Sequence, residues 1–198
     1  RSTEPSRLVV PPLRTQSYEQ TIVADGPVAY WRLGDTAGSI YFDDVLGRYL
    51  GTFGSLAGSQ VELGQPGAIM GDPDTAAGFL GIVDSKGEVL SEDALNTPAF
   101  TAEFWALRLG GENTYTSPLT HRDLNDDIVP PYRKGWTFYA TDANTWQFRT
   151  GDGTDTWSII DGPAVRDGEW THLVGTHDGG TAMRFYVDGA LAGSMEGA

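Results

Sequence analysis

The sequence lacks several features that would by themselves decide its class. It contains no cysteine, which excludes disulfide bonds and thiolate metal sites. It has no run of about 18 apolar residues, the length that a membrane-spanning helix requires. Arg1 is followed by polar residues rather than by the apolar stretch of a signal segment, so we expect a processed, trimmed or excerpted chain.

Basic residues are also scarce. There are 13 lysines and arginines against 27 aspartates and glutamates, which gives a formal net charge of −14. This charge repels phosphate backbones and anionic lipid, so neither nucleic-acid binding nor membrane insertion is expected. It fits an extracellular protein or one that collects divalent cations. The lack of cysteine does not oppose an extracellular location, because a chain of 198 residues buries about 70% of its unfolded surface and needs no crosslinks.

Turn-forming residues are abundant in the chain. The sequence has 26 glycines and 11 prolines, and turn residues interrupt it every ~8–12 positions. Regularly spaced short strands with turns between them predict an all-β sandwich or jelly roll of two antiparallel sheets. The expected strands are 28–33, 76–84, 100–109, 117–121, 135–141, 145–149, 156–160, 170–176, 183–188 and 190–194.

One short helix is expected at the start of the domain, after an arm. Ser17 and Gln20 have the spacing of a capping box, and the turn residues 25–27 end the helix. Residues 1–16 contain two consecutive prolines, which disfavour helix and favour extended backbone. We therefore predict an extended N-terminal arm over 1–16, ordered only by contacts outside its own core, and one sandwich domain over 17–198.

Alternation along the strands separates core residues from a possible binding face. Aromatic rings on that face would stack on sugars, and planar amide and guanidinium groups would bind hydroxyls. The candidate binding face consists of Glu103, Trp105, Tyr139, Gln147, Arg149, His172, Arg184 and Tyr186. An alternative is that Trp105 and Trp170 are covered by neighbouring strands or loops, as large aromatic residues usually are. For His172 the alternative is a structural role, hydrogen-bonded between the two sheets.

Four segments of the sequence resemble a known family. They are 25–35, 64–79, 100–106 and 167–194, and the last is the most specific, with Trp-x-His, a turn, and an aromatic strand ending in YVDG. They resemble the laminin-G-like, concanavalin A-like domains of bacterial and phage proteins. The resemblance implies a jelly-roll β-sandwich and a non-catalytic module that binds glycans or proteins, in many members with calcium. The opening segment also resembles those of tail and other virion proteins of phages that infect actinobacteria.

Two acidic turns are candidates for that calcium. Asp43 and Asp44 form one, and Asp72 and Asp74 form the other. Calcium takes ~6–8 oxygen ligands, so either pair supplies only part of a site and backbone carbonyls would have to complete it. The alternative for each pair is an ordinary solvated turn.

Catalytic motifs are missing. Laminarinase-like glycosidases share this sandwich and carry Glu-x-Asp-x-x-Glu on one strand, because a retaining carboxylate pair must lie about 5–5.5 Å apart. No glutamate here is followed two residues later by aspartate, and Glu103 is alone on its strand. Nucleophile-elbow, phosphate-loop and zinc-protease motifs are also missing. We therefore predict that the chain is not an enzyme.

Two functional hypotheses follow. The first is a structural protein on the tail or head surface of a phage, which contacts glycans or neighbouring subunits in an oligomeric assembly. The alternative is a carbohydrate-binding module of a secreted bacterial protein. Both imply an extracellular or virion location. Because members of the family usually continue beyond the YVDG hairpin, we also expect strand 28–33 to gain a neighbour from sequence beyond residue 198 or from another chain.

Overall fold

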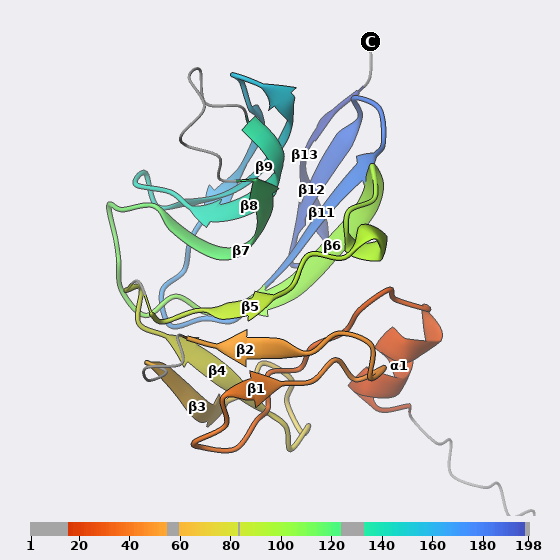
Figure 1. Ribbon diagram of the computed structural model, residues 1–198. Coiled ribbons are helices and arrows are strands. Elements are labelled where there is room, and N and C mark those ends of the chain that lie inside the picture. Colours follow the sequence, from red (N-terminus) through yellow and green to blue (C-terminus); the bar gives the residue numbers. More distant parts are fainter. Residues whose placement is uncertain (1–15, 55–59, 83, 124–132, 197–198) are drawn as a thin grey trace, which may run out of the picture.

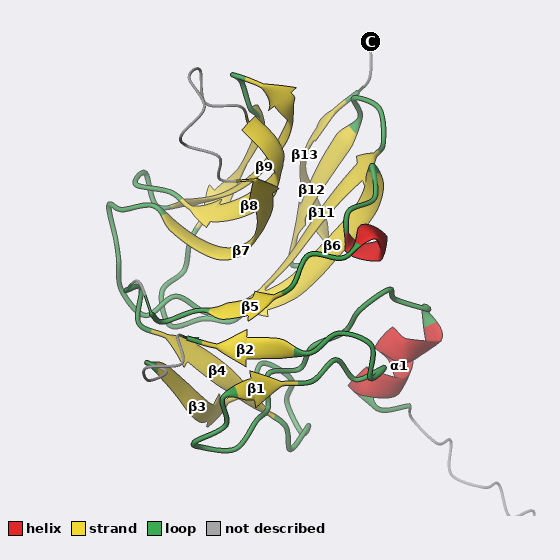
Figure 2. Cartoon of the chain, in the orientation of Figure 1, coloured by secondary structure: helices red, strands yellow, loops and turns green. Residues whose placement is uncertain are grey.

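The computed structural model describes residues 16–54, 60–82, 84–123 and 133–196 (Figure 1). Strands and loops make up nearly all of this part of the chain, and the helices are short (Figure 2). The arm predicted for 1–16 lies outside the described residues except at its last position, so it stays a prediction. Within the described ranges, no helix is long and apolar enough to cross a membrane.

Two four-stranded antiparallel sheets form the β-sandwich that the sequence predicted (Figure 1). The first sheet has the strand order β10-β9-β8-β7, and the second has the order β13-β12-β11-β6. The strands are β6 (Ala99–Ala106), β7 (Thr116–Asp123), β8 (Arg133–Ala140), β9 (Thr145–Thr154), β10 (Ser158–Ala164), β11 (Thr171–Asp178), β12 (Met183–Val187) and β13 (Ala190–Met195).

Aromatic side chains fill the space between the two sheets. Phe138 and Phe148 stack with their ring centroids 4.7 Å apart, and Phe185 of the other sheet lies 6.0 Å from Phe138. All three side chains are fully buried. Gly175 faces these rings, and a Cβ atom at this position would approach Phe138 and Phe148 to 2.7 Å. The core therefore requires glycine at position 175.

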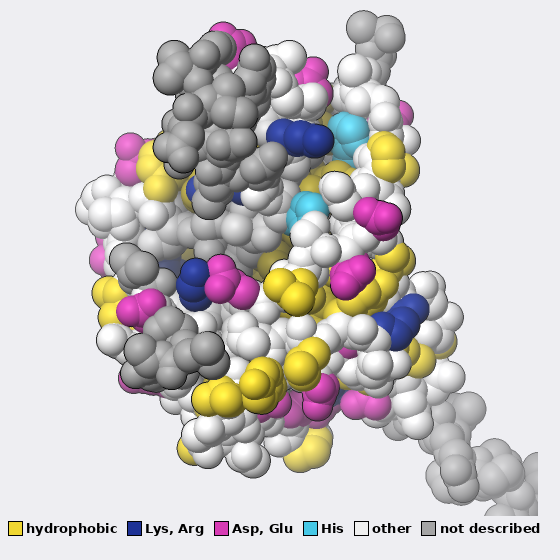
Figure 3. All heavy atoms as spheres, in the orientation of Figure 1, with side chains coloured by type: hydrophobic (Ala, Val, Ile, Leu, Met, Phe, Trp, Pro, Cys, Tyr) yellow, Lys and Arg dark blue, Asp and Glu magenta, His cyan; other side chains and the backbone are white. Residues whose placement is uncertain are grey.

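The described residues between 17 and 95 form a further layer, which we call the N-terminal layer. It contains two small sheets, β1-β2-β5 and β3-β4. Its elements are α1 (Tyr18–Ala24), β1 (Tyr41–Phe42), β2 (Gly51–Phe53), β3 (Val61–Pro66), β4 (Thr75–Phe79), β5 (Gly87–Val89) and the 3₁₀ turn Asp93–Leu95. In Figure 1 this layer lies below β6, and hydrophobic side chains form a row across its surface in Figure 3.

The predicted capping box starts α1. The Ser17 hydroxyl accepts a hydrogen bond from the backbone N–H of Gln20, and the Gln20 side chain accepts one from the backbone N–H of Ser17, both at 3.1 Å. The helix ends at Ala24, and its C-cap is Asp25, the first of the predicted turn residues. The helix prediction is confirmed at both ends.

Every expected strand overlaps an observed one except 28–33. That segment makes a single β-bridge, from Trp31 to Asp44. Its backbone is held instead by a side chain, because the N–H of Tyr30 donates to Asp44 Oδ1 at 2.7 Å. The expectation of a regular strand is therefore wrong, and its proposed neighbour stays a prediction. The sequence analysis also missed β1, β2, β3 and β5, which are short and rich in glycine or polar residues.

Candidate functional site

The residues predicted to form one binding face lie on two opposite faces of the sandwich. All of them alternate with core residues, so all point away from the inter-sheet core. Tyr139, Gln147 and Arg149 lie on the outer face of the first sheet, whereas the outer face of the second carries Glu103, Trp105, His172, Arg184 and Tyr186. The single-face prediction is wrong because alternation separates inside from outside but does not say which of the two sheets a strand joins.

Helix α1 covers part of the second sheet's outer face. Trp105 donates from Nε1 to the hydroxyl of Tyr18 at 3.0 Å. Its ring also lies against His172, with 4.9 Å between the centroids. Burial is the main cause that raises the pKa of Tyr18 above its ordinary value. Trp105 is therefore partly covered, by the helix α1 rather than by the strands or loops of the alternative, whereas Glu103 stays exposed.

His172 does not lie between the two sheets. The alternative that it is hydrogen-bonded between them is therefore wrong about its position. The ring faces outward against Trp105, and its Nε2 atom is buried without a hydrogen-bond partner among the described residues. Its backbone N–H donates to Asp188 at 2.9 Å. His172 therefore packs in an aromatic cluster under α1.

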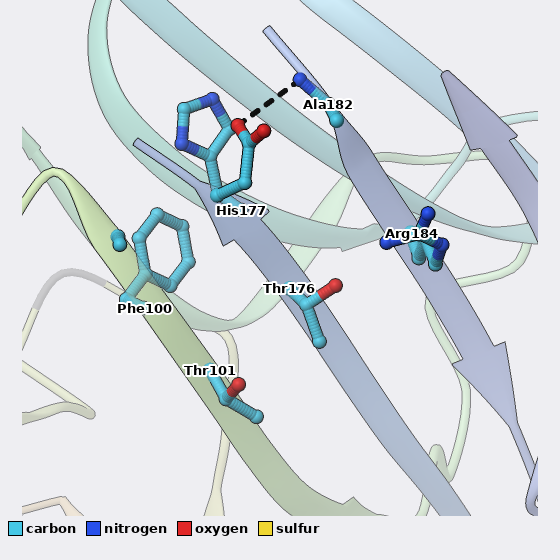
Figure 4. Close-up of a pocket in the computed structure, with 8 residues that line it drawn as sticks. Phe100, Thr101, Thr176, His177, Ala182 and Arg184 are labelled. Carbon is cyan, nitrogen blue, oxygen red and sulfur yellow. Dashed lines mark hydrogen bonds between the residues drawn. The ribbon is translucent and has the colours of Figure 1, made fainter. Parts of the chain in front are cut away.

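A hollow of about 420 Å³ lies at one end of β6, β11 and β12 (Figure 4). Phe100 and His177 stack in it, with centroids 5.7 Å apart. Asp178 accepts the backbone N–H of Ala182 at 3.2 Å, and Arg184 pairs with Glu196 at 3.2 Å. Each of these polar groups already has a hydrogen-bond or ion-pair partner in the protein, which leaves few of them to bind a ligand.

The outer face of the first sheet carries a cluster that we call the tyrosine–arginine face. It combines three predicted residues with three that the sequence analysis missed. Its members are Tyr115, Arg122, Tyr139, Gln147, Arg149 and Asp161.

Arg149 occupies the corner between two tyrosine rings. Its guanidinium carbon lies 4.8 Å from the ring centroid of Tyr139 and 5.3 Å from that of Tyr115. The two rings are almost perpendicular, at 88°. Cation–π attraction on both sides fixes the plane of the guanidinium group. The Nε atom donates to Gln147 Oε1, so this side chain is held at three points.

A chain of hydrogen bonds extends from this corner in both directions. Gln147 is only 7% exposed and donates from Nε2 to Asp161 at 2.5 Å. On the other side, Arg122 donates from Nη1 to the Tyr139 hydroxyl at 2.8 Å. The Nε atom of Arg122 is buried and has no partner among the described residues. The cluster is therefore preorganised before any ligand arrives.

A pair of asparagines holds the loop that carries Tyr115. Asn113 and Asn144 exchange two hydrogen bonds, of 3.1 and 3.2 Å, which tie the loop before β7 to the β8–β9 hairpin. Both asparagines have positive φ angles, of 62° and 58°, a conformation that asparagine tolerates better than most residues. Sequence signals for Tyr115 were weak, because it lies in a loop where alternation assigns no face.

The acidic turn at Asp72 and Asp74 is occupied by an arginine. Arg32 binds Asp72 Oδ1 at 2.8 Å through Nη2 and binds Asp74 through Nε. Glu19 of α1 is a third carboxylate, 3.5 Å from Nη1. The hydrogen bond from Arg32 is the main cause that holds the pKa of Asp72 below its ordinary value. This cluster joins α1 to the loop before β4.

The other acidic turn is also engaged. Asp44 is 3% exposed, and its two oxygens accept backbone N–H groups of Tyr30 and Arg48 at 2.7 and 3.1 Å. Asp43 is exposed. Within residues 16–54, 60–82, 84–123 and 133–196, no three acidic or histidine side chains could hold a metal together. As arranged, the four aspartates do not fit a calcium site, and calcium binding stays a prediction.

Comparisons with known proteins agree on the fold. A family model described as the concanavalin A-like lectin/glucanases superfamily matches residues 67–198, which is more than half of the chain. The chain belongs to this superfamily. No curated protein matches it.

Two solved structures are similar to the chain. One is of botulinum neurotoxin type C, which depends on interaction with two ganglioside molecules to enter cells. It shares 13% identity with a TM-score of 0.57, over 86% of this chain and 39% of that one. The other, an S-layer domain-containing protein of Clostridium thermocellum, shares 19% identity with a TM-score of 0.41, over 84% of this chain and 71% of that one. The chain therefore spans well under half of the neurotoxin structure, and at 13% identity the likeness to the neurotoxin shows the fold alone.

Proposed function

We propose that this chain is a non-catalytic carbohydrate-binding module and that the tyrosine–arginine face binds the saccharide. The observation that carries the proposal is the exposed ring of Tyr115, 51% accessible, beside the fixed guanidinium group of Arg149. An exposed aromatic ring stacks on the apolar face of a sugar. The guanidinium group of Arg149 beside it donates to the sugar's hydroxyl groups, while the buried Gln147 holds that guanidinium group in place.

The second sheet supports the same function less well. Its largest aromatic residue, Trp105, already packs on His172 and bonds to Tyr18. Arg184 is paired with Glu196. A ligand at this face would have to displace α1 or break an ion pair, whereas the first sheet requires neither.

The absence of catalysis is part of the proposal. Glycoside hydrolysis requires two carboxyl groups across the scissile bond. Among the residues that define the tyrosine–arginine face, Asp161 is the one carboxylate, and it accepts a hydrogen bond from Gln147. This supports binding without turnover, and incubation with the bound glycan should release no reducing ends.

A glycan array followed by calorimetry tests the proposal. Tyr115→Ala should weaken binding about 2- to 10-fold, the worth of one aromatic stack. Tyr41→Ala is the matched control, because this tyrosine is equally accessible, at 48%, but lies in the N-terminal layer. The proposal fails if no glycan binds, or if the two variants lose affinity equally.

A structural role in an assembly is the second candidate, and the N-terminal layer favours it. Exposed apolar surface of this kind marks contacts between proteins. Its large accessible side chains include Ile40, Leu50, Met70, Leu80, Ile82 and Leu90. A phage virion is one such assembly, and that assignment rests on the resemblance of the opening segment. Light scattering at micromolar concentration would support this candidate by showing an oligomer, and a monomer that binds glycans would favour the module.

Calcium binding remains a separate proposal that rests on the family resemblance. A cation that binds the native state must raise its stability. Thermal unfolding with calcium and with a chelator therefore tests it, and equal midpoints at low salt would count against a structural ion.

A further inference from the structure

The arginines of this acidic protein divide into two groups. In the described part of the chain, five of the eight arginines pair with a carboxylate, as the net charge of −14 would favour. These are Arg32, Arg48, Arg108, Arg166 and Arg184. Among the described residues, no carboxylate lies within salt-bridge distance of Arg122, Arg133 or Arg149. All three belong to the first sheet, on β7, β8 and β9.

We propose that the tyrosine–arginine face selects a saccharide that carries a carboxylate, and that Arg149 binds that carboxylate. The inference rests on the proposed function, because it names the class of ligand for the same face. Its ligands are sugars of the uronic or sialic acid type.

The geometry at Arg149 favours a carboxylate over a hydroxyl group. Its Nε atom donates to Gln147, and the rings of Tyr115 and Tyr139 hold its plane. The donors on Nη1 and Nη2 make no hydrogen bond to the described residues. Two parallel donors on one planar edge match the two oxygens of a carboxylate. The exposed ring of Tyr115 stands where the sugar bearing that carboxylate would stack.

Arg122 strengthens this preference without contacting the carboxylate. Its Nη1 atom donates to the Tyr139 hydroxyl, so its positive charge is fixed at the hydroxyl end of the ring on which Arg149 lies. A second cation that has no carboxylate partner among the described residues raises the local potential for an anion. The structure thus gives separate roles to the two arginines, Arg149 in contact and Arg122 in support.

The charge balance also selects against densely charged polymers. The net charge of −14 repels a polyanion at distances approaching the Debye length, about 8–10 Å in physiological salt. Asp161 lies on the same face and is held by Gln147, which disfavours a second anion close to the first. We therefore expect isolated carboxylates on sugars rather than heavily sulfated chains to be bound.

The test compares each acidic saccharide with its own methyl ester, which keeps the sugar and removes the charge. Calorimetry with trigalacturonate and sialyllactose, each as acid and ester, should show about 10- to 100-fold tighter binding of at least one acid, the range of a charge-assisted hydrogen bond. Arg149→Gln should abolish the difference, and Arg149→Lys should keep part of it. Arg184→Gln, on the other sheet, is the matched control and should preserve it.

The outcomes separate the two proposals. Equal binding of acid and ester overturns the carboxylate preference while the carbohydrate-binding function stands. Stronger binding of heparin oligosaccharides than of any carboxylated sugar also overturns it. Loss of the difference in Arg184→Gln but not in Arg149→Gln would place the anion site on the other sheet. No binding to any saccharide, charged or neutral, overturns both proposals.

Discussion

The β-sandwich and the N-terminal layer differ in how they bury hydrophobic side chains. The sandwich has strands of five to ten residues, and their inner side chains form one buried cluster around Phe138, Phe148 and Phe185. In the described part of the N-terminal layer, Phe42 and Phe53 are the buried hydrophobic side chains, on strands of two and three residues. Long alternating strands can build a core by themselves, whereas short glycine-rich ones cannot.

Polar contacts replace core packing in the N-terminal layer. Arg32 gathers Glu19, Asp72 and Asp74, and Asp44 binds two backbone N–H groups. Such contacts are directional and depend on charge, so pH and single polar substitutions should affect this layer more than the sandwich.

Phe148→Ala should produce the largest loss of stability. The side chain is fully buried among aromatic rings, so its removal should cost about 3–5 kcal/mol in the free energy of unfolding, measured in urea. Phe53→Ala, in the N-terminal layer, should leave unfolding of the sandwich almost unchanged. Equal losses in the two variants would show that the two regions share one core.

Gly175→Ala should destabilise the sandwich by about 1–3 kcal/mol, because the added Cβ would meet Phe138 and Phe148 at 2.7 Å. Gly180→Ala is the matched control, since a Cβ there meets nothing closer than 3.4 Å. Urea midpoints of both variants measure the effect. A stable Gly175→Ala protein would mean that the aromatic core can move apart.

Acid should loosen both regions through different carboxyl groups. Arg32 lowers the pKa of Asp72 in the N-terminal layer, and Arg108 lowers that of Asp167 beside the sandwich. Because the pKa of each carboxyl group is lowered in the folded state, its ion pair stabilises the fold above the ordinary carboxyl pKa of 3.8. This stabilisation is lost as the pH falls below 3.8. Arg32→Gln should remove the acid dependence of stability in the N-terminal layer alone. Amide hydrogen exchange measured between pH 5 and pH 3 follows this change.

In the same experiment, Arg108→Gln serves as the reciprocal variant. It should change protection around β6 and β11, where Asp167 is bound at 2.5 Å, and should leave α1 unaffected. If either variant altered both regions, the two polar contacts would belong to one cooperative unit.

Ser17→Ala should have the smallest effect, about 1 kcal/mol and confined to α1, because it removes the side-chain acceptor for the Gln20 N–H. Ser17→Asp keeps an acceptor at this position and should restore protection of the helix. Amide exchange within 18–24 measures both. Destabilisation of the whole sandwich by Ser17→Ala would show that α1 is part of the main folding unit.

The sequence predicted the features that depend on local patterns. The capping box at Ser17 and the strands with alternating aromatic residues, such as that around Trp146 and Phe148, follow from spacing alone. The partners of charged groups did not, because the contact of Arg32 with Asp72 joins residues far apart in the chain. The division of the predicted binding residues between two sheets was missed for the same reason, since strand order is a long-range property.

Saccharide binding at the outer face of the first sheet can be tested without any substitution, by amide chemical-shift mapping during titration with the tightest-binding saccharide. We expect the largest shifts to cluster at Tyr115, Gln147 and Arg149. Shifts that cluster instead at Trp105, Thr176 and Arg184 on the second sheet would contradict it.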